Sequence, residues 1–105
     1  MKREIIIDNK KYTMPKLSVD DYMEYLDIAE KIESHTRYTR QDMEAMTLFV
    51  CKAYGEQFTV EQLKDKETGL DASGIIMEFQ MIDMGVGNEL MKKMEKIQEN
   101  FQSGK

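Results

Sequence analysis

The only cysteine and the only histidine, Cys51 and His35, are the side chains that could support nucleophilic or acid–base chemistry. Cys51 ends the apolar run 48–51, where a packed thiol is far more common than a nucleophile. A structural zinc site needs a full set of Cys or His ligands, which two distant residues do not supply. A single cysteine also excludes a disulfide within the chain and fits the cytoplasm.

The carboxylate pairs and the paired glycines are weaker candidates for chemistry. Asp20/Asp21 and Glu24/Asp27 fall on the polar surface of an expected helix, with nothing nearby that indicates a cleft. The segment 85–87, Gly-Val-Gly, lacks the third glycine and the preceding strand of a dinucleotide-binding turn. We therefore predict no catalytic, cofactor-binding or metal-binding residue, and a protein that is not an enzyme.

One DNA-binding pattern needs to be weighed. Residues 39–64 give a helix, a break at Gly55 and a short capped helix, which superficially resembles a helix-turn-helix. The second helix would offer Glu61 and Asp65 to the phosphates, and the whole chain carries a net charge of -5. Nucleic acid is therefore a poor default partner, but a small DNA-binding regulator remains the alternative from another functional class.

Composition and charge indicate the size and class of the protein. The 105 residues fit a single domain, 1–105, with 41% hydrophobic and 33% charged residues. No apolar run approaches the roughly 18 residues of a membrane span, and the N-terminal apolar run is too short for a signal peptide. Residues 1–17 hold five basic against two acidic residues, whereas 18–34 hold one basic against six acidic residues. The acidic segment is either a solvated helix face or a surface for a basic partner, including another copy of the chain.

The N-terminus predicts a β-hairpin over residues 3–14. The β-branched run 4–7 is followed by Asp8-Asn9-Lys10, a turn signal, and then by a second short strand. Asn9 is the residue expected to take the left-handed conformation. Two strands alone are marginal in water, so the hairpin must pack on the helices or pair with another chain.

The rest of the chain predicts helices, so we expect an α-rich (α+β) fold: a bundle of about four helices over 18–100, with the short hairpin at its N-terminus. Ser18, Thr39, Thr59 and Asp71 are the expected N-caps. Tyr25 and Ile28 fall on the flank of the first helix, where they are either part of a broad core or exposed at a contact. The expected inner face of this helix consists of Val19, Tyr22, Met23, Leu26, Ala29 and Ile32. The buried stripe expected for the second helix is Met43, Met46, Thr47, Val50 and Ala53.

Residues 75–101 form the most distinctive stretch, because they combine helical periodicity with five of the ten methionines. Gly85 and Gly87 interrupt the pattern, which predicts either two helices or one kinked helix. The methionines either fill the core or contact a partner, and both roles can coexist. The residues that we propose for partner contact are Met77, Phe79, Met81, Met84, Met91, Met94 and Ile97.

Three segments carry a family resemblance: Lys11–Tyr22, Tyr38–Glu44 and Ala53–Thr59. They resemble the tail assembly chaperones of long-tailed phages and prophages of Gram-positive bacteria, and the similarity spans nearly the whole chain. The resemblance transfers no catalytic or binding residue. It implies a cytoplasmic protein of the bacterial host that is absent from the mature virion and self-associates.

The resemblance also implies partners. Such chaperones bind the long, helical tape measure protein, keep it soluble and help to bring tail tube subunits to it. A longer form made by ribosomal frameshifting is thought to contact the tube protein. No nucleic acid or membrane is expected as a partner. A minor structural subunit of the virion is a further alternative.

Overall fold

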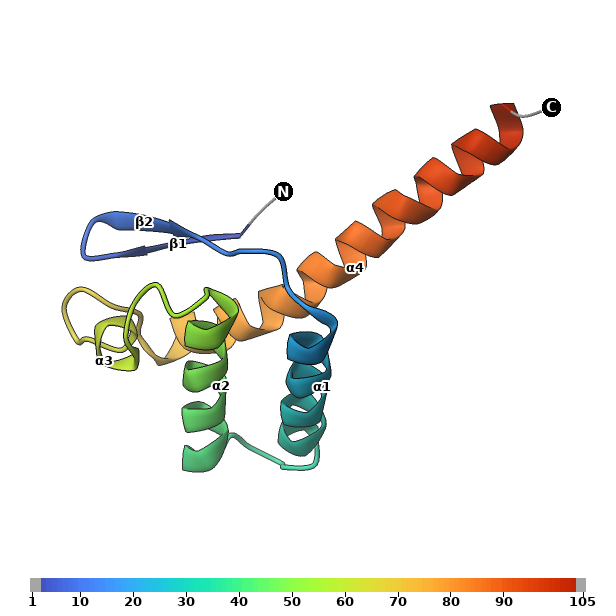
Figure 1. Cartoon of the computed structure of the whole chain (residues 1–105). Helices are drawn as coiled ribbons and strands as arrows, with labels where there is room; N and C mark the ends of the chain where they lie inside the picture. Colours follow the sequence, from blue (N-terminus) through green and yellow to red (C-terminus); the bar gives the residue numbers. More distant parts are fainter. Residues whose placement is uncertain (1–2, 104–105) are drawn as a thin grey trace.

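The computed structural model describes residues 3–103, with side chains up to Glu99. It confirms an α-rich fold with four helices and an antiparallel N-terminal hairpin (Figure 1). In chain order the elements are β1 Glu4–Ile7, β2 Lys10–Thr13, α1 Val19–Glu33, α2 Arg40–Ala53, α3 Val60–Leu63 and α4 Ala72–Ser103.

The hairpin turns through Asp8 and Asn9, because Ile7 and Lys10 are paired partners in the ladder. Both turn residues have positive φ, 53° and 64°, as a two-residue turn that matches strand twist requires. Ile5 and Ile7 are buried on one face of the hairpin. The hairpin therefore packs its apolar face on the helices, which supplies the support that two strands need.

Helices α1 and α2 run antiparallel side by side, and α2 packs against α1, α3 and α4 (Figure 1). The expected N-caps are confirmed. The Ser18 hydroxyl accepts a hydrogen bond from the Asp21 N–H, and Thr39 and Thr59 form full capping boxes. At α4 the Asp71 carboxylate accepts the Gly74 N–H at 2.8 Å.

An aromatic cluster forms the centre of the core. Tyr25 stacks on Phe79, with ring centroids 4.5 Å apart, and Phe49 contacts both rings at 5.6 and 5.9 Å. The buried stripe predicted for α2 is confirmed for Met46, Thr47, Val50 and Ala53, with Met43 half-buried. Residues from three helices thus meet at one centre.

The inner face predicted for α1 is partly wrong. Tyr25, assigned to the flank, is buried, and Val19, Met23 and Leu26 are exposed by 76%, 54% and 45%. Their partners on the predicted face, Tyr22, Ala29 and Ile32, are half-buried. α1 is rotated because its broad apolar surface offers two overlapping faces, and the aromatic cluster selects the one that carries Tyr25.

The two-helix interpretation of residues 75–101 is also wrong, since α4 is one uninterrupted helix of 32 residues. A Cβ atom at Gly85 or Gly87 would meet nothing within 4 Å, so these glycines serve no close packing. Each costs about 1 kcal/mol against alanine. The helix continues through them because residues 89–98 are mostly good helix formers, such as Glu, Leu, Met, Lys and Gln.

Candidate binding surface on the projecting helix

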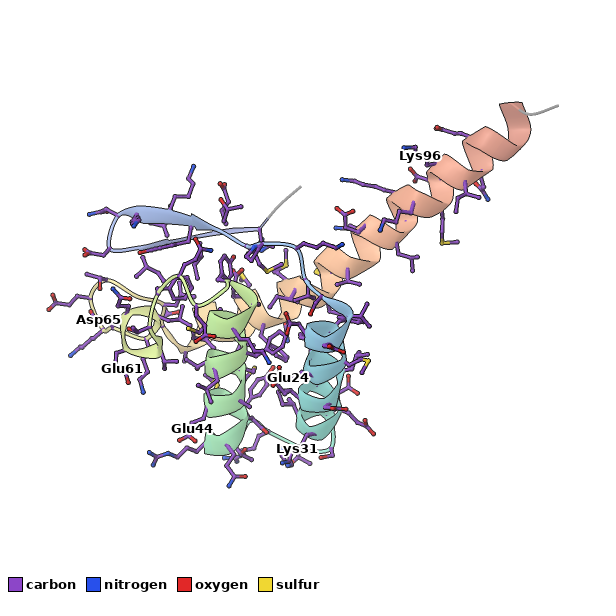
Figure 2. The ribbon with its side chains drawn as sticks, viewed as in Figure 1. Glu24, Lys31, Glu44, Glu61, Asp65 and Lys96 are labelled. Atoms are coloured by element: carbon purple, nitrogen blue, oxygen red, sulfur yellow. The ribbon has the colours of Figure 1, made fainter. Side chains whose placement is uncertain are left out.

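Helix α4 consists of a packed half and a projecting half. Ile75, Phe79 and Ile82 are 1–4% exposed and belong to the core. Every residue from Gly87 to Glu99 is exposed, and this part of the helix extends away from the body (Figure 1). Lys96 lies on this projecting part, with no other element beside it (Figure 2). The molecule is therefore elongated, with a longest dimension of 57 Å.

Two exposed apolar rows run along α4. The outer Met row consists of Met77, Met84 and Met91, exposed by 64%, 57% and 61%. Its members are seven residues apart, which places them one above the other on a helix. With 3.6 residues per turn, this row lies roughly opposite the buried residues Ile75 and Ile82.

The distal apolar row consists of Leu90, Met94 and Ile97, exposed by 58%, 55% and 66%. It continues the core-facing stripe of α4 beyond the end of the body, with the same helical spacing. Contiguous exposed apolar side chains mark interaction sites more often than singly scattered ones. The projecting half is therefore the strongest candidate for a binding surface.

The structure distributes the residues proposed from sequence among different environments. Met77, Met84, Met91, Met94 and Ile97 are exposed on α4, whereas Met81 is half-buried. Phe79 is 4% exposed within the aromatic cluster, so the structure does not bring it to this surface. Leu90 also belongs to this surface, since it lies on the same periodic stripe, but it is not among the residues proposed from the sequence.

A buried polar network fixes the direction in which α4 leaves the body. The Glu78 carboxylate accepts hydrogen bonds from the Arg3 guanidinium at 2.6 and 3.2 Å and from the Tyr54 hydroxyl at 2.7 Å. Burial raises the pKa of Tyr54, and the hydrogen bond to Glu78 adds a smaller increase. The hydrogen bond to Glu78 also raises the pKa of Arg3. The N-terminus, α2 and α4 are thereby tied together at one carboxylate.

A second anchor lies about one and a half turns further along α4. The Tyr22 hydroxyl of α1 donates to Asp83 at 2.7 Å, and this hydrogen bond raises the pKa of Tyr22. Burial raises the pKa of the neighbouring Tyr25 to about 12. The helix is held up to this point, and the exposed half begins just beyond it.

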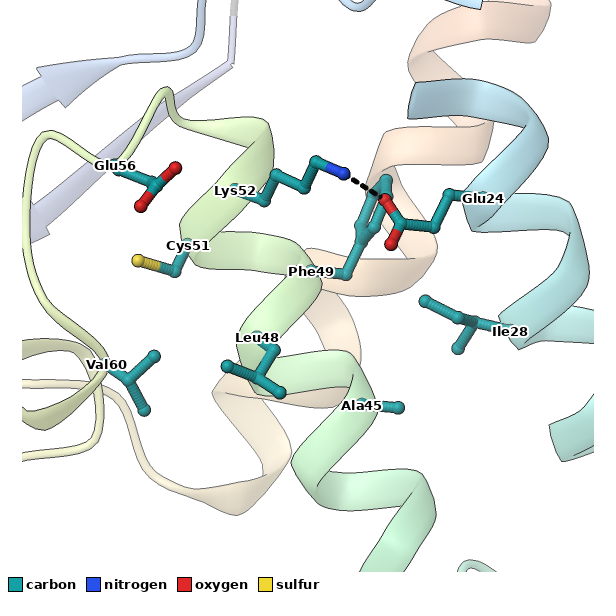
Figure 3. A pocket seen from close by; sticks show the side chains of 9 residues that line it. All are labelled: Glu24, Ile28, Ala45, Leu48, Phe49, Cys51, Lys52, Glu56 and Val60. Atoms are coloured by element: carbon teal, nitrogen blue, oxygen red, sulfur yellow. Dashed lines mark hydrogen bonds and ion pairs between the residues drawn. The ribbon is translucent and has the colours of Figure 1, made fainter. Parts of the chain in front are cut away.

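A groove lies on the body between α1, α2 and α3, with a volume of about 400 Å³ (Figure 3). Its apolar floor is bordered by the ion pair between Lys52 and Glu24, whose N and O atoms are 2.6 Å apart. The lining residues are Glu24, Ile28, Ala45, Leu48, Phe49, Cys51, Lys52, Glu56 and Val60.

Cys51 at this groove has the properties of a structural thiol. It is 6% exposed, and its Sγ donates to the Phe58 carbonyl at 3.0 Å. Burial raises the pKa of the thiol, which keeps it protonated and lowers its reactivity as a nucleophile. His35 instead contacts Asp42, with Nδ1 and Oδ2 2.9 Å apart.

Residues 3–103 give little support for a metal site, a membrane-spanning helix or a DNA-binding helix. No group of three or more His, Cys, Asp and Glu side chains there could hold a metal ion. In the same range, no helix combines the length and apolarity that crossing a bilayer requires. Helix α3 has only four residues and buries Leu63, so it lacks the exposed length of a DNA recognition helix.

An exposed apolar surface on a firmly anchored helix is typical of a protein that acts by binding another macromolecule. The comparison with protein families agrees with this class: the model described as "Phage tail chaperone protein" matches residues 1–103. The chain belongs to this family of phage tail chaperones, which is generally non-enzymatic. No curated protein and no solved structure matches the chain.

Proposed function

We propose that this protein binds the tape measure protein in the cytoplasm of the bacterial host and keeps it soluble until the tail tube covers it. The observation that carries the proposal is the outer Met row, which exposes Met77, Met84 and Met91 over about four turns of α4. Methionine adapts to irregular apolar surfaces, and an amphipathic client helix presents its anchors at matching intervals. Membership of the phage tail chaperone family supports a phage tail protein as the client.

Recruitment of tail tube subunits forms the second part of the proposal. The outer Met row lies on the side of α4 opposite the buried residues Ile75 and Ile82, so a client bound there leaves the other surfaces of the body accessible. A frameshift-extended form would supply a further segment for contact with the tube protein. The chaperone itself would leave before the particle is complete, and mass spectrometry of purified virions should then not find it.

The test is co-expression with the tape measure protein of the same phage or prophage, followed by pull-down and a solubility assay. We expect the client to be soluble only with this chain. The double variant M84E/M91E should lose the client and keep its helical circular dichroism signal, because both side chains are exposed.

The matched control is K93Q/K96Q, which changes the net charge by the same two units at exposed positions on the other side of the same helix. It should retain the client. If M84E/M91E folds and binds as well as the control, the outer Met row is not the binding surface. If the unmodified chain neither solubilises nor co-purifies with the tape measure protein, the proposed function itself is wrong.

A further inference from the structure

A third exposed apolar row lies on helix α1, on the side that turns away from the core. Val19, Met23 and Leu26 are exposed by 76%, 54% and 45%. They follow one another at intervals of four and three residues, so they form a straight ridge on the helix. We name them the α1 row.

The α1 row and the distal apolar row of α4 match in length and spacing. Leu90, Met94 and Ile97 also follow one another at intervals of four and three residues. At 1.5 Å per residue each ridge is about 10 Å long. Two ridges of this kind interdigitate when helices pack side by side.

The charges that border the two rows are of opposite sign. Asp20 and Asp27 lie on one flank of the α1 row, with Lys31 one turn beyond Asp27. Lys93 and Lys96 lie on one flank of the distal row, with Glu89 one turn before Lys93, so the two flanks keep net charges of opposite sign. The side chains of Asp20, Asp27, Lys93 and Lys96 are exposed. None of them forms an ion pair within the described part of the chain. When the helices run parallel, face to face, helical geometry brings the lysine flank onto the aspartate flank.

Within one chain the two rows do not cover each other. Every member of both rows is at least 45% exposed, and the distal half of α4 extends away from α1 (Figure 1). The α1 row and the distal apolar row can therefore pack on each other only when they belong to two different molecules. A second copy is the one partner that is certain to carry the complementary row.

We propose that the distal apolar row of one copy packs on the α1 row of a second copy, with Lys93 and Lys96 beside Asp20 and Asp27. The contact joins two different surfaces, so it either closes into a ring or pair or continues as an open chain. It leaves the outer Met row exposed on another side of α4. The proposal does not depend on the identity of the client.

The test uses two single variants of the full chain, M23E and M94E, analysed by sedimentation velocity and light scattering. The unmodified chain should self-associate, and each variant should be monomeric with an unchanged helical signal, because both side chains are exposed. An equimolar mixture should form a heterodimer, since M23E keeps the distal row and M94E keeps the α1 row.

This mixing result separates the proposal from other modes of association. Pairing of α4 with α4 predicts that M23E still self-associates, and that outcome overturns the proposal. So does a monomeric unmodified chain, or a mixture that remains monomeric. M84E is the matched control on the outer Met row and should associate normally, so loss of client binding and loss of self-association are distinguishable.

Charge reversal gives an independent readout in case a glutamate in either row disturbs the helix. D27K and K96E should each weaken self-association several-fold at low salt, and their equimolar mixture should recover most of the loss. Added salt should reduce the differences, because exposed charges are screened. If neither reversal has an effect at low salt, the lysine flank does not face the aspartate flank.

Discussion

The two halves of α4 carry the same helical stripe of apolar residues and have different environments. In the first half the stripe is buried against α1 and α2, with Phe79 in the aromatic cluster. In the second half Leu90, Met94 and Ile97 are more than half exposed. Periodicity thus identifies the face that needs a partner, whereas the rest of the fold decides whether that partner lies in the same chain.

The largest expected difference between the halves is in stability. Phe79→Ala should lower the free energy of unfolding by about 3–5 kcal/mol, because it empties the centre of the aromatic cluster. Ile97→Ala, in the exposed half, should change it by no more than about 0.5 kcal/mol. Urea denaturation of the two variants, followed by circular dichroism at a concentration where the chain is monomeric, measures both. Equal effects would show that the second half is covered in solution.

The anchor of the packed half should have the next largest effect. Glu78→Gln keeps the side-chain size and removes the charge that accepts from Arg3 and Tyr54, which should cost about 2 kcal/mol. The matched variant Glu95→Gln on the exposed half should be nearly neutral. Thermal denaturation compares them. A neutral Glu78→Gln would mean that packing alone directs α4.

The boundary between the halves gives a smaller effect of opposite sign. Gly85→Ala and Gly87→Ala should each stabilise the helix by up to about 1 kcal/mol, since both positions lie in an uninterrupted helix with free space around them. The helical signal should rise or stay constant. A loss of stability would indicate that the helix bends or breaks there in solution.

The smallest expected effect concerns pH and the cap of α2. Burial alone would raise the pKa of Asp42, but hydrogen bonds from the Thr39 backbone, His35 and the Thr39 hydroxyl lower it below its usual value. A carboxylate with a lowered pKa contributes stability above its unfolded pKa and loses it as pH falls through the folded pKa. The difference in Tm between the unmodified chain and Asp42→Asn should therefore shrink from about pH 6 to about pH 3. A constant difference would contradict this origin.

Local chemistry made much of this fold predictable from sequence. Ser18, Thr39 and Thr59 cap helices because their hydroxyls reach a backbone N–H three residues on, and Asn9 forms the hairpin turn because it tolerates positive φ. These features depend on a few neighbouring residues. The family resemblance, carried by three short segments, was confirmed over residues 1–103.

The features that sequence reasoning missed depend on residues far apart in the chain. The rotation of α1, which buries Tyr25 and exposes Val19, is set by Phe49 and Phe79 on two other helices. Whether a methionine on α4 is buried or exposed depends on how far along α4 the helices α1 and α2 cover it. The burial of Phe79, one of the proposed contact residues, has the same cause.

The seven-residue interval of the outer Met row has a consequence for the shape of any bound helix. Seven residues fall short of two full turns of an α-helix, so Met77, Met84 and Met91 drift by about 20° per step around α4. A straight client would lose contact along this row, whereas one that winds around α4 with a left-handed twist would follow it. The best client segment is then a helix whose own apolar residues repeat every seven positions, and shuffling that repeat at constant composition should weaken binding.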